Sequence, residues 1–194
     1  MQSKADLRLI LKERLACLSK ESCLTAAEEV ATQLVNSEVF ASSKTVACYL
    51  PIGNELDTAL IINQIWRQAK ICYLPVILAT REMQFVSFSA VDKLVATKYG
   101  GLEPIVTTEK LIEPQKLDLV IVPLLGFNSR GFRLGRGAGF YDRTFDFKKL
   151  LPQSKAKPYL LGVGYNIQLV EFEPDPWDIA LDEIIISYSL ITCD

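Results

Sequence analysis

The chain has 194 residues, 49% of them hydrophobic, and a formal net charge of −2, which suits one globular domain with a sizeable core. It contains no histidine, which excludes histidine-activated nucleophiles, histidine acid–base catalysis and histidine zinc sites. The nearly neutral charge provides no general attraction to nucleic acid, and no apolar run approaches the length of a membrane span.

Cysteine usage and the first residues indicate the compartment. The five cysteines have irregular spacing, which fits neither a disulfide framework nor a zinc knuckle. The amino-terminal segment is charged throughout and does not resemble a signal peptide. We therefore expect a cytoplasmic protein. We also expect a monomer that forms one domain over residues 1–194 and has no nucleic-acid or membrane partner.

Two helices are predicted first. Residues 4–18 place leucines at three- and four-residue steps, the pattern of an amphipathic helix. Lys4 and Arg8 share a face of this helix one turn apart, so they could grip one polyphosphate; the alternative is a solvated cationic face. A capping box at Thr25–Glu28 predicts that a second helix begins there and runs to about Asn36.

Strands and helices then alternate. Residues 45–50 form a short apolar run typical of a buried parallel strand, and Glu55 lies in the loop that follows. Either Asp57 or Thr58 caps the next helix, which is predicted to end near residue 69. Residues 71–77 predict another strand, and the alternating residues 83–88 predict a more exposed one.

The second half of the chain continues this alternation. Residues 117–125 predict a central strand, residues 159–165 a further buried strand, and residues 183–190 a final strand. Gly162 and Gly164 fall on one face, which indicates close packing of a backbone or ligand. We predict an α/β fold, specifically a three-layer α/β/α domain with a mainly parallel open sheet.

A glycine-rich segment, residues 122–143, follows the central strand and reads VPLLGFNSRGFRLGRGAGFYDR. It leads into a helix predicted to end near residue 150. A strand, a glycine loop and a helix present backbone N–H groups to an anion, and the four arginines add bidentate donors. The spacing matches neither GxxxxGK[ST] nor GxGxxG. Spacing alone therefore leaves an anion site and a tight connection with solvated arginines equally open.

The residue identities in this segment are more specific than the spacing of its glycines. RLGRGAGFYDR, after an apolar strand that ends in Val-Pro, resembles the signature of 5-formyltetrahydrofolate cyclo-ligases, also called 5,10-methenyltetrahydrofolate synthetases. Three more blocks fit the family order across nearly the whole chain: Lys4-x-x-x-Arg8, Tyr49-Leu50-Pro51 with Glu55, and Pro176-Trp177-Asp178.

The resemblance implies an ATP- and magnesium-dependent reaction. The substrate would be 5-formyltetrahydrofolate, and the products 5,10-methenyltetrahydrofolate, ADP and phosphate. In the implied mechanism, ATP phosphorylates the N5-formyl oxygen. N10 then attacks the formyl carbon that carries this oxygen, and phosphate departs as the ring closes. No side-chain nucleophile is needed, which agrees with the absence of histidine, so catalysis can rest on positioning and charge neutralisation.

The resemblance also implies the residues of each site. The ATP site would comprise Lys4, Ala5, Asp6, Leu7, Arg8, Arg133, Leu134, Gly135, Arg136, Gly137, Ala138, Gly139, Phe140 and Tyr141. The folate site would comprise Leu50, Glu55, Arg136, Gly137, Ala138, Gly139 and Phe140. Arg136 and Tyr141 would be catalytic, and Asp142 and Asp178 would bind Mg²⁺.

Alternatives remain open for the carboxylates. Glu55 would otherwise be a solvent-facing loop residue, and Asp142 would otherwise cap or salt-bridge within its helix.

Several positions depart from the family pattern. Leu124 replaces a usual glycine, Asn128 an aspartate and Phe140 a tyrosine, while Trp177 stands where histidine often precedes the aspartate. None of these changes removes a residue assigned to ATP or Mg²⁺, so we predict an active enzyme. The alternatives are a non-catalytic family member that binds nucleotide or folate, and an α/β enzyme that acts on another phosphorylated small molecule.

Overall fold

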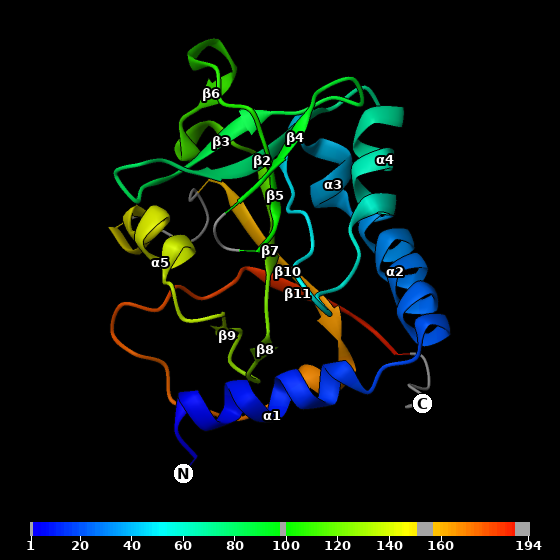
Figure 1. Ribbon diagram of the computed structural model, residues 1–194, viewed down its shortest axis with the longest axis vertical. Helices are drawn as coiled ribbons and strands as arrows, with labels where there is room; N and C mark the ends of the chain where they lie inside the picture. The colour runs from blue at the N-terminus through cyan, green and yellow to red at the C-terminus, as the bar shows by residue number, and fades with distance from the viewer. Residues whose placement is uncertain (1, 98–99, 151–156, 189–194) are drawn as a thin grey trace.

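A seven-stranded sheet organises the fold in a computed structural model, which describes residues 2–97, 100–150 and 157–188 (Figure 1). In spatial order its strands are β11 (Glu183–Ser187), β10 (Tyr159–Tyr165), β7 (Leu119–Pro123), β1 (Thr45–Ala47), β2 (Ile71–Ile77), β3 (Met83–Ser87) and β6 (Leu111–Ile112). The first five run parallel; at one edge β3 pairs antiparallel with β2, and β6 pairs antiparallel with β3. The predicted mainly parallel open sheet is thus confirmed.

Helices cover both faces of this sheet. They are α1 (Lys4–Ala16), α2 (Lys20–Val35), α3 (Glu38–Ser42), α4 (Ala59–Arg67) and α5 (Phe140–Thr144), with 3₁₀ turns η1 (Thr108–Lys110), η2 (Pro114–Lys116), η3 (Asp146–Leu150) and η5 (Asn166–Gln168). Figure 1 shows α2 and α4 on one side and α5 on the other. From the centre, β1–α4–β2 moves one way along the sheet and β7–α5–β10 the other. Right-handed crossovers in opposite directions place their helices on opposite faces.

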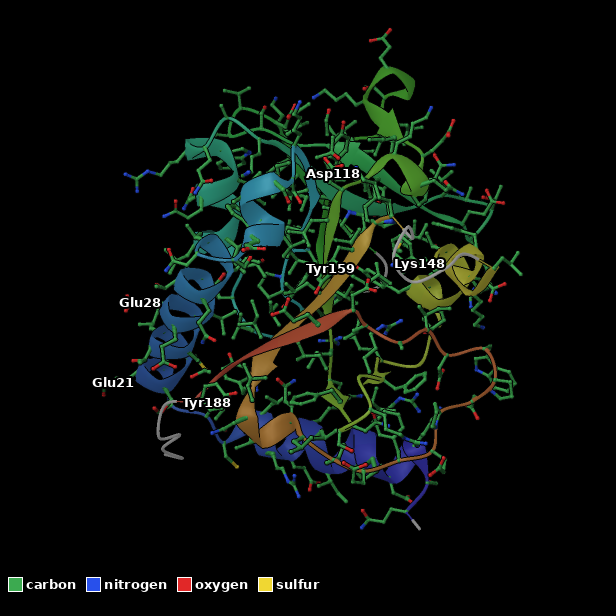
Figure 2. The ribbon with its side chains drawn as sticks, turned by 180° about the vertical axis from the view of Figure 1, so that it is seen from behind. Glu21, Glu28, Asp118, Lys148, Tyr159 and Tyr188 are labelled. Carbon is green, nitrogen blue, oxygen red and sulfur yellow. The ribbon has the colours of Figure 1, made fainter. Side chains whose placement is uncertain are left out.

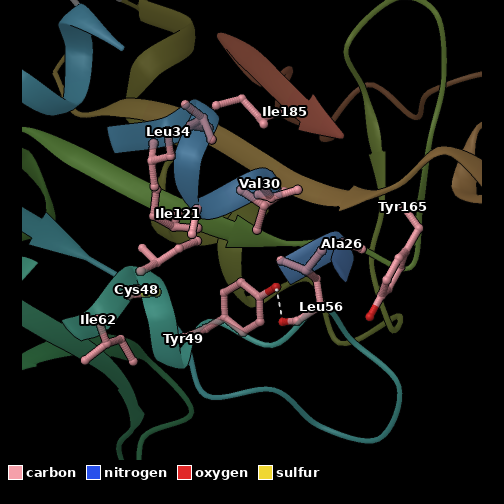
Figure 3. Close-up of a cluster of buried hydrophobic side chains, with 14 of the residues drawn as sticks. Ala26, Val30, Leu34, Cys48, Tyr49, Leu56, Ile62, Ile121, Tyr165 and Ile185 are labelled. Atoms are coloured by element: carbon pink, nitrogen blue, oxygen red, sulfur yellow. Dashed lines mark hydrogen bonds between the residues drawn. The ribbon is translucent and has the colours of Figure 1, made fainter. Parts of the chain in front are cut away.

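Alternation along the central strand divides the core in two. Leu119 and Ile121 of β7 belong to a cluster beneath α1, α2 and α4, whereas Val120 and Val122 belong to a second cluster with Phe145. Figure 3 shows the first cluster, in which the Tyr49 hydroxyl donates a 3.1 Å hydrogen bond to the Leu56 carbonyl. A strand buried on both faces needs a continuous apolar run, which is why the sequence of β7 is apolar throughout.

Asp118, labelled in Figure 2, joins the amino ends of β1 and β7. Its Oδ2 accepts from the backbone N–H groups of Lys44 and Thr45, at 2.9 and 3.0 Å, and its Oδ1 accepts from Lys157 Nζ at 2.6 Å. Burial alone would raise the pKa of Asp118, but these hydrogen bonds outweigh burial and hold the pKa well below its usual range. The carboxylate is therefore a structural anchor of the sheet.

Three local predictions are wrong. The second helix begins at Lys20 rather than at Thr25, because Ser19 caps it by accepting from the Ser22 N–H at 3.2 Å. The helix after the glycine-rich segment stops at Thr144, where Phe145 turns into the core, and η3 replaces the rest. Strand β3 is largely buried rather than exposed, because β6 pairs with it and α5 packs near it.

Two small hairpins flank the main sheet. They are β4 (Leu94–Ala96) with β5 (Leu102–Pro104), and β8 (Gly126–Phe127) with β9 (Arg133–Leu134). No helix within the described ranges is long and apolar enough to cross a membrane.

Candidate functional site

A cavity of about 400 Å³ opens at the carboxyl ends of β1 and β7. These neighbouring strands are where the two crossovers diverge, the position at which open α/β sheets bind ligands. The predicted site residues that line it are Lys4, Arg8, Leu50, Glu55, Arg133, Leu134, Gly135, Arg136, Gly137, Ala138, Gly139, Phe140, Tyr141, Asp142 and Asp178. Ala5, Asp6 and Leu7 are not in its wall. Leu7 is buried in the core, and Asp6 completes the capping box of α1 with Ser3.

Helix α1 brings two cations to this cavity. Its buried residue Leu11 packs directly on the backbone of β8, because a Cβ atom at Gly126 would lie 2.5 Å from Leu11 Cδ1. Only glycine permits this approach. Arg8, one turn before Leu11, then donates from Nε to the Gly135 carbonyl at 2.8 Å. The alternative of a solvated cationic face is therefore wrong for Arg8.

Lys4 forms an ion-pair triad with two carboxylates of the loop at residues 174–178. Its Nζ lies 2.6 Å from Asp175 Oδ2 and 2.5 Å from Asp178 Oδ2. The loop is closed by a 2.8 Å hydrogen bond from the Asp175 N–H to Asp178 Oδ2. Burial alone would lower the pKa of Lys4, but the two carboxylates outweigh burial and raise that pKa. Lys4 is therefore fully charged at neutral pH.

Asp142 lies beside this triad. Its Oδ2 accepts from Arg133 Nη2 at 2.9 Å, and its Oδ1 accepts from the N–H of Ile179, the residue after Asp178, at 3.3 Å. Gly139, not Asp142, is the N-cap of α5, and this helix start has no side-chain capping hydrogen bond. Asp142 is therefore neither a helix cap nor part of a salt bridge within its helix, and the fold brings it next to Asp178.

The donor chemistry of these two carboxylates fits magnesium, which prefers carboxylate, phosphate and water oxygens. Asp142, at the end of the glycine-rich segment, and Asp178, in the loop at residues 174–178, line the same cavity. Within the described ranges, no group of three or more His, Cys, Asp or Glu side chains could hold a metal. A bound Mg²⁺ would therefore take the rest of its shell from phosphate oxygens and water.

Glu55 connects the loop after β1 to the glycine-rich segment. Its side chain is 7% exposed, so the solvent-facing alternative is wrong. Its Oε2 accepts from the Ile52 N–H at 2.9 Å, and its Oε1 accepts from Arg136 Nε at 2.7 Å. Arg136 also donates from Nη2 to the Ile52 carbonyl. A buried carboxylate and a partly exposed guanidinium thus face the cavity as a pair.

Tyr141 lies beneath Arg133, whose guanidinium carbon is 5.2 Å from the ring centroid. Burial raises the pKa of Tyr141 far above its ordinary value, and the charge of Arg133 only partly opposes this shift. The phenol is therefore neutral at physiological pH. It can donate a hydrogen bond to a ligand, but it cannot act as a general base.

A family profile described as the 5-formyltetrahydrofolate cyclo-ligase family matches residues 1–187. The chain belongs to this family. It is 31% identical over 179 residues to a 5-formyltetrahydrofolate cyclo-ligase of Escherichia coli K12, covering 91% of this chain and 96% of the relative. It is 29% identical over 190 residues to a protein of the same name from Mus musculus, covering 94% and 93%.

Solved structures of similar proteins have the same fold. A 5,10-methenyltetrahydrofolate synthetase from Mycoplasma pneumoniae superposes with a TM-score of 0.74 at 25% identity, covering 95% of this chain and 98% of that one. A 5,10-methenyltetrahydrofolate synthetase from Aquifex aeolicus superposes with a TM-score of 0.79 at 28% identity, covering 98% and 92%.

Leu124, which replaces a usual glycine of the cyclo-ligase pattern, is accommodated by strand β10. A Cβ atom on Gly162 would lie 2.8 Å from Leu124 Cδ2, and one on Gly164 would lie 2.9 Å from Leu124 Cδ1. The leucine side chain therefore fills the space above the two glycines and is 2% exposed. The close packing predicted at these glycines is confirmed, and Leu124 provides it together with Leu181 over Gly162 and Gln168 over Gly164.

Some lining residues of this cyclo-ligase site were not identified from the sequence. Asp175 is the clearest, since it shares Lys4 with Asp178; its only signal is its place in Pro-Asp-Pro-Trp-Asp. The β4–β5 hairpin contributes Gly101, Leu102 and Glu103 to the cavity wall. Gly101 lies against Ile52 of the loop after β1, where a Cβ atom would be 3.0 Å from Ile52 Cδ1, a tertiary contact that the local sequence does not specify.

Proposed function

We propose that this family member converts 5-formyltetrahydrofolate to 5,10-methenyltetrahydrofolate, with ATP hydrolysed to ADP and phosphate. The strongest support is that four motif blocks, which are spread over most of the sequence, line one cavity. That cavity combines cations suited to phosphate oxygens with a buried carboxylate suited to ring N–H groups. Family membership provides the independent support.

The proposed chemistry needs no protein nucleophile. The N5-formyl oxygen attacks the γ-phosphorus of ATP, the bond to the β-phosphate oxygen breaks, and ADP leaves. N10 then attacks the formyl carbon, and the C–O bond breaks with release of phosphate. N10 loses its proton, and the five-membered methenyl ring remains. Phosphorylation matters because an amide oxygen by itself is a poor leaving group.

In this proposal the residues position both substrates and stabilise charge. Lys4 and Arg8 bind phosphate oxygens at one end of the cavity, and Glu55 accepts from the pterin N–H groups at the other. Arg136 lies between them with 41% of its side chain exposed, so it is accessible to the phosphoryl group being transferred. Tyr141 donates from its neutral hydroxyl. Leu50 contributes an apolar wall for the folate.

Asp142 and Asp178 would hold Mg²⁺. A magnesium ion at this position supplies neutralisation of the charge on the phosphates. Lys4 and Arg133, which now neutralise the two carboxylates, would redirect their N–H donors towards the nucleotide oxygens.

The direct test combines purified protein with ATP, Mg²⁺ and 5-formyltetrahydrofolate. We expect near-ultraviolet absorbance from the conjugated methenyl product, with one ADP formed per product, and no change when any component is omitted. Nucleotide binding without product would identify a non-catalytic family member. ATP consumption that does not require folate would indicate a different phosphorylated substrate.

We also propose that residues 1–194 form one domain and that the protein acts as a cytoplasmic monomer. Light scattering coupled to size exclusion tests the monomer, and a second species at working concentration would contradict it.

A further inference from the structure

Trp177 presents a large aromatic surface without a structural partner. Its side chain is 64% exposed and forms part of the cavity wall. Within the described ranges it makes no hydrogen bond or ring contact. The other tryptophan, Trp66, differs on each point: its Nε1 donates to the Phe88 carbonyl at 3.1 Å, and its ring lies 5.6 Å from that of Phe88. Leaving so much apolar surface in water gains nothing for folding.

The loop that carries Trp177 is nevertheless held firmly. On one side Lys4 pairs with Asp175 and Asp178, and on the other Lys149 Nζ donates to the Pro176 carbonyl at 3.1 Å. Within the loop the Asp178 N–H bonds the Asp175 carbonyl at 2.9 Å. The loop, orange in Figure 1, thus runs beside the first turn of α1. An exposed ring on a fixed loop loses little conformational entropy when a ligand covers it.

Charge indicates which ligand ring covers it. Trp177 directly precedes Asp178 and lies at the Lys4 end of the cavity, where the proposed function puts the nucleotide phosphates. Glu55, the proposed partner of the pterin, belongs to the loop after β1, where it pairs with Arg136. We propose that Trp177 stacks on the adenine ring of ATP and sets the preference for a purine nucleotide. This inference rests on the proposed function for the position of the phosphates.

Fluorescence gives a direct test. A Trp66→Phe variant leaves Trp177 as the sole tryptophan. In that variant we expect Mg²⁺–ATP to quench the emission and to shield the ring from acrylamide. Mg²⁺ with inorganic tripolyphosphate should do neither, because it carries the phosphates without a base. An equal response to tripolyphosphate, or a response only to 5-formyltetrahydrofolate, overturns the proposal.

Affinity measurements on Trp177 variants give a second test by calorimetry. Base–aromatic stacking predicts that Trp177→Leu weakens ATP by about five- to a hundredfold and that Trp177→Phe retains most of the affinity. Tripolyphosphate affinity should be unchanged in both variants, and Trp66→Phe should bind ATP like the wild type. Wild-type ATP affinity in Trp177→Leu contradicts the stacking. Thermal unfolding confirms that each variant is folded.

The two proposals fail separately. Product formation by the wild type with unaltered ATP binding in Trp177→Leu rejects the stacking alone. Base-dependent quenching without any methenyl product rejects the proposed reaction and retains the stacking. A wild type that binds no ATP rejects both.

Discussion

The ammonium of Lys4 lies 2.5 Å from Asp178 Oδ2, so the cation proposed for the nucleotide neutralises the carboxylate proposed for the metal. Asp175 holds the same ammonium from the other side. A nucleotide that draws Lys4 towards its phosphates therefore exposes Asp178, and a metal on Asp178 releases Lys4. Binding of the two ligands should be cooperative, because each removes the partner that opposes the other.

Replacing Lys4 with methionine tests this relationship. Lys4→Met should weaken ATP by roughly ten- to a hundredfold, since a charge-assisted hydrogen bond contributes about 1.5–3 kcal/mol. The same change should tighten binding of Mn²⁺ in the absence of nucleotide, measured by electron paramagnetic resonance. Lys12→Met, an exposed lysine on the same helix, is the control and should alter neither. Unchanged Mn²⁺ affinity in Lys4→Met would show that Lys4 does not compete with the metal.

The two carboxylates that share Lys4 form a matched pair for the metal assignment. Asp178→Asn should shift the Mg²⁺ activation curve to higher concentration and reduce turnover strongly. Asp175→Asn removes an equivalent ion pair but should leave the Mg²⁺ requirement near that of the wild type. The measurement is a Mg²⁺ titration of activity for all three proteins. Coincident curves would mean that the magnesium site lies elsewhere.

Glu55→Gln separates folate binding from nucleotide binding. Glutamine keeps the size of the side chain but replaces one acceptor with a donor and removes the charge that holds Arg136. We expect a higher KM for 5-formyltetrahydrofolate and little change in the KM for ATP. A selective loss of ATP affinity would show that the loop after β1 binds the nucleotide and not the folate. An Arg136→Gln variant and the double variant would measure how far the ion pair itself contributes.

Leu124→Ala should destabilise the protein by about 2–5 kcal/mol, because it leaves a cavity above Gly162 and Gly164. Chemical denaturation provides the measurement. Gly162→Ala alone should also destabilise, since its Cβ would lie 2.7 Å from Leu181 Cδ1 and 2.8 Å from Leu124 Cδ2. The double variant should lose less than the sum, because Leu124→Ala removes one of the two close contacts of the new Cβ, and that Cβ fills part of the cavity. Additive losses would contradict the packing described for this pair.

Asp118 makes a testable contribution to the pH dependence of stability. Its folded pKa is depressed below the unfolded value near 4, so its stabilisation is present at neutral pH and is lost as the pH falls below about 4. Asp118→Asn should therefore cost roughly 1.5–3 kcal/mol at pH 7 and progressively less below pH 4. Urea unfolding across this range compares the two proteins. A constant difference would mean that the carboxylate charge does not matter.

Sequence patterns located some elements to the residue and others only approximately. The bounds of β2 and β10 match the prediction because each is a mostly apolar run of 7 residues, a typical strand length. The start of α2 was wrong because Ser19 and Thr25 both make plausible caps. Local patterns cannot choose between them, since the choice depends on which turn buries its apolar side chains against the sheet.

Some parts of the candidate site could likewise be predicted from the sequence, and others could not. The glycine-rich segment was identifiable because its residues are contiguous and its composition is unusual. The partners of Lys4 were not, because Asp175 lies 171 positions away and nothing in either segment specifies the other. The proposed ligands of Asp142, Asp178 and Glu55 stay predictions until binding is measured.

The contact between α1 and the loop at residues 174–178 also constrains how the protein is made. Helix α1 leaves the ribosome early in synthesis, but Asp175 and Asp178, which pair with Lys4, emerge only after most of the chain has been synthesised. Until then Lys4 has no carboxylates to hold it, and the wall of the cavity that contains Trp177 does not exist. We therefore expect a nascent chain arrested before Pro174 to bind no nucleotide, and an arrested chain in which residue 188 has cleared the tunnel to bind it.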